Sequence, residues 1–362
     1  MTTTSRATTN EIALLRIALL RLVAQRIAGP ALPTPADAVR WLTAMQAQDL
    51  RAALISVAVR TTGGRKQVEA ALDAGEIVRS WPMRGTLHLV AAEDLGWLRD
   101  LLAPRVVAGQ ARRHAGLGLD QAAFDRARQA AESALAGGGA LTRAELLAVF
   151  ERAGTDPAGQ RGYHLIGQLA QTGTLCLGPM RDGGQLFVLA AEWIRRPRKL
   201  EREEALAELA TRFFRSHGPA TLKDFIRWTN LTAADARTGL SLARPRLDRM
   251  EVDGVEMLLD PATPELLRAA GRRARGVFLL PGFDELILGY ADRSAVLPPA
   301  YAGRIVPGGN GVLQPTVVSD GRVVGTWRYP RRGEGEPVTT PFEAWPERVA
   351  RAIPKLAAAL ED

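Results

Sequence analysis

Cysteine and histidine are scarce in this chain of 362 residues. The single cysteine, Cys176, excludes an internal disulfide and a cluster of thiolate metal ligands. The four histidines lie far apart, and none forms an HxxxH or HExxH pair, the spacing that places two ligands on one helical face. We therefore expect no metal site. Cys176 lies in a short apolar run, which favours a buried, inert thiol.

Long apolar runs are also lacking. No stretch reaches the roughly 20 residues that cross a bilayer as a helix. The first ten residues are polar and rich in threonine, without the apolar core of a signal peptide. These patterns predict a cytoplasmic protein that does not contact a membrane. The length is sufficient for two or three domains.

Basic residues are in excess. Lysine and arginine together number 47 against 39 acidic residues, which gives a net charge of +8, and most of the basic residues are arginine. A guanidinium group can bind phosphate through two parallel hydrogen bonds, so this excess favours a polyanionic partner. A GC-rich genome, which enriches arginine, alanine and glycine together, is the alternative explanation.

A pattern of helix, capped helix, helix and β-hairpin occurs three times. In each copy a threonine followed three residues later by an acidic residue predicts a helix start; these threonines are Thr34, Thr142 and Thr221. Short β-prone runs around turn residues predict the hairpins. The expected strands are 76–81 with 86–90, 174–177 with 185–190, and 247–252 with 255–259.

Three helices followed by a hairpin make a winged-helix unit, in which one helix can enter a DNA groove and the hairpin can touch the backbone. Such units also serve as scaffolds or as protein-interaction modules. After them, a hairpin around Asp320-Gly321 and a closing helix over 344–360 predict a β-rich module. We interpret the chain as mainly helical α+β, with three tandem winged-helix units and a C-terminal β-rich module. The expected boundaries are 10–95, 120–195, 200–262 and 272–362.

Two glutamines and an aspartate, Gln46, Gln48 and Asp49, follow directly on an apolar helical run. Side chains two residues apart face different ways on a continuous helix, so the glutamines can converge only where the backbone leaves helical geometry. Taken alone, the residues favour a local role, in which Gln46 caps backbone groups and Gln48 is solvated. A functional amide pair is the alternative.

Several charged residues are further candidates. Arg79, Arg84 and His88 lie on the first expected hairpin, where they can contact a DNA backbone or be solvated. Arg304 adjoins a glycine-rich loop, 303–311, which lacks the pattern of a phosphate-binding loop but could probe a groove.

Asp284 and Glu285 lie inside an apolar segment, where a carboxylate is costly unless it is paired. Arg293 or another arginine can hold one of them. A catalytic or water-holding role is the other interpretation.

The sequence resembles the winged-helix DNA glycosylases of the AlkZ and YcaQ type, which excise bulky alkylated purines and unhook DNA interstrand crosslinks. The matching segments extend over nearly the whole chain: 46–48, 82–88, 218–228, 279–293 and 321–328. The family pattern is Gln-apolar-Gln in the AlkZ branch and Gln-apolar-Asp in the YcaQ branch. With Gln46-Ala47-Gln48, this chain looks like the AlkZ branch.

This resemblance implies a monofunctional DNA glycosylase that acts as a monomer on duplex DNA carrying alkylated purines or crosslinks, without a cofactor. Gln46 and Gln48 are then the catalytic residues, and Asp49 and Asp284 are candidates for catalytic support. The implied DNA contacts are Arg79, Arg84, His88, Arg293 and Arg304. A role in self-resistance to a genotoxic natural product is compatible with the resemblance. The alternative is a non-catalytic, winged-helix DNA-binding or regulatory protein.

Overall fold

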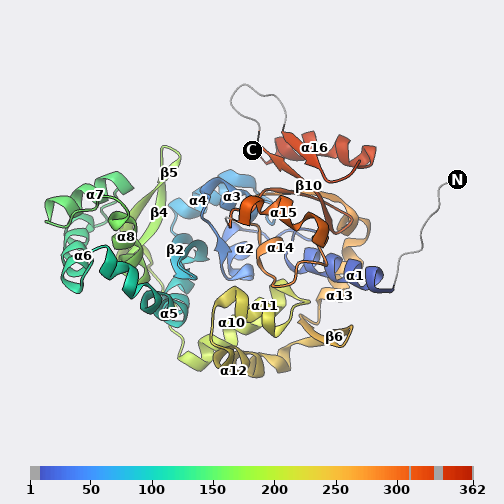
Figure 1. Ribbon diagram of the computed structural model, residues 1–362, viewed down its shortest axis with the longest axis horizontal. Coiled ribbons are helices and arrows are strands. Elements are labelled where there is room, and N and C mark those ends of the chain that lie inside the picture. Colours follow the sequence, from blue (N-terminus) through green and yellow to red (C-terminus); the bar gives the residue numbers. More distant parts are fainter. Residues whose placement is uncertain (1–8, 310, 330–336, 361–362) are drawn as a thin grey trace.

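The computed structural model of the protein describes residues 9–309, 311–329 and 337–360. Within these residues helices predominate, and the strands form antiparallel sheets of five, four and two strands (Figure 1). The fold class is mainly helical α+β, as the sequence predicts. No helix in these ranges is long and apolar enough to cross a membrane.

The first region contains the glutamine motif. Thr34 begins α2, because its hydroxyl accepts a hydrogen bond from the Asp37 N–H and Pro35 occupies the first helical position. Two elements of this region, β1 and α3, are not among those predicted. Its elements are α1 (Thr9–Ala24), α2 (Pro35–Leu42), β1 (Met45–Gln46), α3 (Leu50–Ala58), α4 (Gly64–Asp73), β2 (Ile77–Met83) and β3 (Thr86–Ala91).

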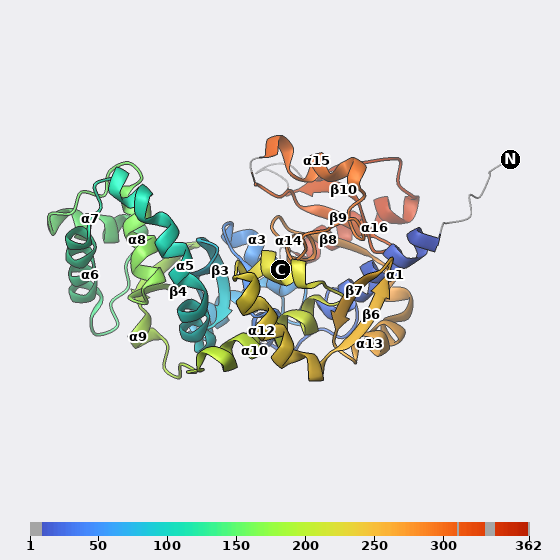
Figure 2. The ribbon, with the colours of Figure 1, turned by 60° about the horizontal axis from the view of Figure 1, so that its bottom comes forward.

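The second region begins with two helices that were not predicted, α5 and α6. The predicted helix start at Thr142 is confirmed, with a complete capping box between Thr142 and Glu145. Its elements are α5 (Leu95–Gly116), α6 (Gln121–Leu135), α7 (Arg143–Arg152), α8 (Arg161–Gln171), β4 (Leu175–Arg181), β5 (Gly184–Leu189) and α9 (Ala190–Trp193). Helices α6 to α8 form an arm at one end of the molecule (Figure 2).

The third region again begins its second helix at a predicted cap, because Thr221 and Asp224 form a capping box. Its elements are α10 (Arg202–His217), α11 (Leu222–Thr229), α12 (Ala233–Ala243), β6 (Asp248–Val252) and β7 (Val255–Leu259). Strands β6 and β7 form the two-stranded sheet.

The C-terminal region contains the four-stranded sheet, in the order β11-β10-β9-β8. The predicted hairpin around Asp320-Gly321 is confirmed, and its first strand begins at Thr316. The elements are α13 (Thr263–Ala270), β8 (Val277–Leu280), α14 (Glu285–Leu288), α15 (Ala302–Ile305), β9 (Thr316–Ser319), β10 (Arg322–Arg328), β11 (Val338–Pro341) and α16 (Glu347–Ala359). The division of the chain into three winged-helix units and a module stays a prediction.

The hairpin turns share one backbone geometry. In each, two successive residues have positive φ and the second is glycine, which is the geometry of a two-residue type I′ turn. The pairs are Arg84-Gly85, Asp182-Gly183, Asp253-Gly254 and Asp320-Gly321.

The first two hairpins join into one sheet, with the order β1-β3-β2-β4-β5. The sequence predicts two separate hairpins, but Arg79 of β2 pairs with Leu177 of β4. Strand β1 adds to the other side of the first hairpin, with Gln46 opposite His88. The glutamine motif therefore lies at the edge of a sheet that connects two regions of the chain.

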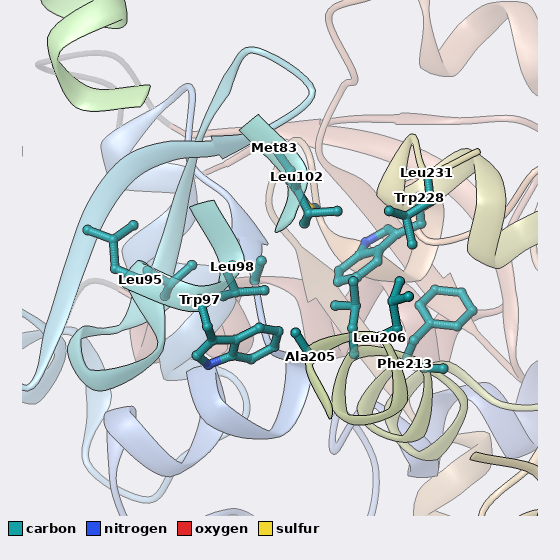
Figure 3. Packing of buried hydrophobic residues seen from close by; sticks show 14 of the residues in the cluster. Met83, Leu95, Trp97, Leu98, Leu102, Ala205, Leu206, Phe213, Trp228 and Leu231 are labelled. Atoms are coloured by element: carbon teal, nitrogen blue, oxygen red, sulfur yellow. The ribbon is translucent and has the colours of Figure 1, made fainter. Parts of the chain in front are cut away.

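A large apolar cluster packs against this sheet and includes residues of its strands; part of it is shown in Figure 3. It contains Met83 at the end of β2, Trp97 of α5, Phe213 of α10 and Trp228 of α11, all buried. The turn between β2 and β3 is thus held against α11, a helix of the third region.

Candidate active site

The chain changes from helix to strand immediately before the glutamine motif. Helix α2 ends at Leu42, and Thr43 has a φ of 70°, which ends the helix. Strand β1 then pairs with β3, and the Ala47 N–H donates to the Leu87 carbonyl at 2.7 Å. Ala47 is buried, whereas the Gln46 side chain reaches Arg84 in the turn between β2 and β3 and the Gln48 side chain reaches the Leu87 N–H of β3. The backbone therefore meets the condition for the two amides to converge.

Protein donors set the orientation of both amides. Arg84 donates from Nη2 to Gln46 Oε1 at 3.0 Å, and the Leu87 N–H donates to Gln48 Oε1 at 3.0 Å. A guanidinium and a backbone N–H can only donate, so the oxygen of each amide must face them. Among the described residues neither amide nitrogen donates a hydrogen bond to the protein. Gln46 is half-buried and Gln48 is exposed.

A buried carboxylate lies behind Gln46. Glu285, the first residue of α14, accepts the Gln46 N–H at Oε1 (3.1 Å) and the Trp228 indole N–H at Oε2 (2.9 Å). His217 Nε2 lies 3.5 Å from Oε2. Burial by itself raises the pKa of Glu285, but His217, Arg84 and the Trp228 hydrogen bond outweigh it and lower the pKa to about 2. Glu285 is therefore ionised at neutral pH.

His88 lies opposite Gln46 and is neutral. Burial and the nearby charge of Arg84 lower the pKa of His88 to about 3. Nδ1 lies 2.8 Å from the Thr86 carbonyl and Nε2 lies 3.0 Å from Arg84 Nη2, so the proton belongs on Nδ1. The expectation that His88 contacts DNA does not fit the structure, because its side chain has no exposed surface.

Arg84 and Arg79 brace the glutamine motif. Arg84 also donates to the Trp228 carbonyl, and burial lowers its pKa. Arg79 donates from Nε to the Ala47 carbonyl at 2.7 Å and from Nη2 to the Gln48 carbonyl at 3.3 Å. Burial lowers the pKa of Arg79 to about 10. Both side chains are half-buried and engaged in these hydrogen bonds, and contact of either with the DNA backbone stays a prediction.

The two candidate supporting aspartates have structural partners. Asp49 caps α3 by accepting the Ala52 N–H at 3.0 Å, and it is exposed beside Gln48. Asp284 is buried and paired with Arg60 through both carboxylate oxygens, at 2.8 and 2.9 Å. The partner of Asp284 is thus an arginine from α3's C-terminal end rather than Arg293.

The remaining predicted DNA contacts lie outside this hydrogen-bond network. Arg293 is half-buried and donates to the Ile287 carbonyl at 2.8 Å. Arg304 is exposed, donates to the Phe342 carbonyl at 3.3 Å and lies over the Tyr301 ring. Sequence reasoning also missed an exposed cation, Arg227, whose charge acts on both Arg84 and Arg293.

Comparison with known proteins identifies the family. The family described as DNA glycosylase AlkZ-like matches residues 39–362, which include every residue of the network around Gln46. The chain belongs to the AlkZ-like DNA glycosylases. The predicted family and enzyme class are therefore confirmed.

Two relatives of this AlkZ-like chain come from Streptomyces sahachiroi. An "Interstrand DNA cross-link repair glycosylase" is 29% identical over 340 residues, 90% of each chain. The solved structure of the DNA glycosylase AlkZ superposes with a TM-score of 0.80 at 26% identity, and the match covers 96% of each chain. The arrangement of helices and sheets described above is thus shared by an AlkZ glycosylase of known structure.

Proposed function

We propose that this AlkZ-like glycosylase hydrolyses the N-glycosidic bond of bulky N7-alkylated purines in duplex DNA and unhooks interstrand crosslinks. Support for the crosslink comes from the relative that is described as an interstrand cross-link repair glycosylase. The observation that carries the chemistry is the pair of amides at the end of β1 and just after it, each held by a protein donor.

The proposed chemistry needs positioning more than a strong base. Alkylation at N7 leaves the purine cationic and already a good leaving group, and the sugar acquires oxocarbenium character as the bond breaks. Each amide oxygen has two lone pairs, and one accepts from Arg84 or from the Leu87 N–H. The second lone pair and the amide N–H groups of Gln46 and Gln48 can orient a water beside the anomeric carbon.

The charges around the motif fit this chemistry. Glu285 is ionised and His88 is neutral, because their pKa values lie at about 2 and about 3. Neither side chain therefore titrates near neutral pH, as a general base would. We infer, from the family resemblance, that one chain acts alone on the damaged duplex.

The test is release of 7-methylguanine, and unhooking of an N7-linked crosslink, from duplex DNA. We expect the wild type to be active and Gln46→Ala and Gln48→Ala to lose excision while they retain DNA binding. Gln121→Ala is the matched control, because Gln121 is an exposed glutamine on α6 whose side chain donates to Asp125.

The alternative function, a non-catalytic DNA-binding or regulatory protein, gives a different result. It predicts no excision by the wild type, specific binding to undamaged DNA, and binding that is indifferent to both glutamine substitutions.

A further inference from the structure

Strand β1 has a partner on only one side, because it lies at the edge of its sheet. The N–H of Ala47 pairs with β3, whereas the N–H of Gln46 points the other way and donates to Glu285. Glu285 therefore takes the place that a further strand would have in the sheet. A strand of two residues has little stability of its own, so this contact, together with the pairing to β3, fixes where Gln46 lies.

A carboxylate is needed at this position. Hydrogen-bond donors from β1 and α11 reach different oxygens of Glu285, the Gln46 N–H at Oε1 and the Trp228 indole at Oε2. An amide offers one oxygen and one NH₂ group, so its NH₂ group would face one of these two N–H donors and could not accept from it. A buried polar group without a partner is costly, so an amide would disturb one of the two contacts.

The charge of Glu285 also acts on the side chain of Gln46 through Arg84. Arg84 is half-buried, burial lowers its pKa, and Glu285 supplies the negative charge that favours its ionised form. Arg84 in turn donates to Gln46 Oε1. Both the backbone and the amide of Gln46 thus depend on the same carboxylate.

We propose that Glu285 is a positioning residue of the glycosylase, which fixes Gln46 in the geometry that binds the attacking water. This inference rests on the proposed role of Gln46 in glycosidic bond hydrolysis. Glu285 is buried without exposed surface, so it acts through Gln46 and Arg84 and does not touch DNA. Its removal slows the chemical step and leaves DNA binding unchanged.

Asp94 provides a matched control. It is also fully buried, and it also accepts a tryptophan indole N–H, from Trp97 at 2.7 Å, together with hydrogen bonds from Arg212 and Arg198. Trp97 lies on α5, Arg212 lies on α10 and Arg198 precedes α10, so none of these partners belongs to the glutamine motif. Asp94→Ala therefore removes an equivalent buried carboxylate next to the same apolar cluster, and it leaves the contacts of Gln46 in place.

The experiment compares wild type, Glu285→Ala, Glu285→Gln and Asp94→Ala. Single-turnover release of 7-methylguanine measures the rate of the chemical step, and Kd for the same duplex measures binding. Hydrogen exchange of a peptide covering 44–49 measures how strongly the backbone amides of β1 are protected. We expect Glu285→Ala to be slower by about 100-fold, as for a misplaced reacting group, with Kd changed by less than about twofold. Exchange of the peptide should rise about tenfold, the effect of one lost charge-assisted hydrogen bond. Asp94→Ala should lower Tm but leave the rate and the exchange of that peptide near wild type.

The outcomes separate the two proposals. An inactive wild type overturns the proposed function itself. An active wild type with a folded Glu285→Ala of equal rate overturns only the role of Glu285, as does an equal loss in Asp94→Ala. If Glu285→Ala does not fold, Glu285→Gln decides, because it keeps the shape: a loss of about tenfold or more at unchanged Kd supports positioning, and a wild-type rate overturns it.

Discussion

Two buried titratable side chains lie next to Gln46. Glu285 is ionised and carries a negative charge, whereas His88 is neutral. Arg84 lies between them, 3.0 Å from the His88 ring nitrogen. Burial, together with this cation, keeps the histidine neutral, and His217 and the cation favour the ionised glutamate. Neither of these two side chains therefore changes its charge across the physiological range.

This constancy predicts a nearly flat pH profile for the chemical step between roughly pH 6 and 8. Glu285 is ionised above its pKa of about 2 and His88 is neutral above its pKa of about 3, so neither changes charge in that interval. Single-turnover rates at several pH values, with enzyme in excess, give the measurement. An acid limb that disappears in Asp49→Asn would show that Asp49 acts as a general base and that the profile was wrongly predicted.

His88 should instead make stability depend on pH. The unfolded chain takes up a proton near the usual histidine pKa of 6.5, whereas the folded chain does so only near 3. The unfolded state thus binds more protons between these values, and the free energy of unfolding falls as the pH falls, by up to about 1.4 kcal/mol per pH unit. The free energy of unfolding, measured by urea denaturation between pH 4 and 7, should depend less steeply on pH for His88→Gln than for wild type. Equal slopes would mean that His88 is not held neutral.

Among the elements, α3 and α14 are joined by a buried ion pair. Arg60, at the end of α3, has no exposed surface and holds Asp284, the cap of α14, while Ser56 donates to the same carboxylate at 2.6 Å. The Arg60 Nε also donates to the Gln25 carbonyl, beyond the end of α1. Three segments of the chain thus meet at one guanidinium group.

We expect Asp284→Asn to lower the free energy of unfolding by about 3–5 kcal/mol, because it leaves the Arg60 charge buried without a counterion. Glu256→Gln is the control: it removes an exposed ion pair with Arg244 and should cost less than about 1 kcal/mol. Urea denaturation of both variants makes the comparison. A cost of similar size in the two would show that water reaches the Arg60 pair.

The predicted elements are those with local signals. The hairpins at Asp182-Gly183, Asp253-Gly254 and Asp320-Gly321 depend on residues that tolerate positive φ, and such a turn forms wherever these residues stand between β-prone runs. The helix starts at Thr142 and Thr221 likewise need only residues three positions apart.

The elements that were missed depend on distant partners. Strand β1 is too short to recognise without β3 beside it, and the pairing of β2 with β4 joins Arg79 to Leu177 across separate regions. For the same reason the sequence indicates Gln46 but not what holds it, since Glu285 and Trp228 are far along the chain. The only local signal was that two carboxylates in an apolar segment require partners.

At the scale of the whole molecule, the excess of arginine is divided between internal and external roles. Arg60, Arg79 and Arg84 are engaged inside the protein, whereas Arg227 and Arg304 are exposed. Net charge alone therefore overstates the number of side chains that can reach phosphate groups.

DNA affinity should fall steeply with salt, because each phosphate neutralised by a cation contributes about −0.9 to the slope of log K against log salt concentration. Arg304→Gln should make the slope less steep by about one. Arg128→Gln is the control, since Arg128 is paired with Asp125 on α6. Titrations of duplex DNA at several salt concentrations test this. A slope near zero for the wild type would contradict binding through arginine and phosphate.

The contact between Gln46 and Glu285 joins residues 239 positions apart. A ribosome makes the first of them early and the second only when most of the chain has emerged. Until α14 has been synthesised and has docked, the edge strand lacks its second partner, and a nascent or truncated chain carries both glutamines in an incomplete site. Under the proposed role of Gln46, activity therefore requires the C-terminal region to have been made and folded.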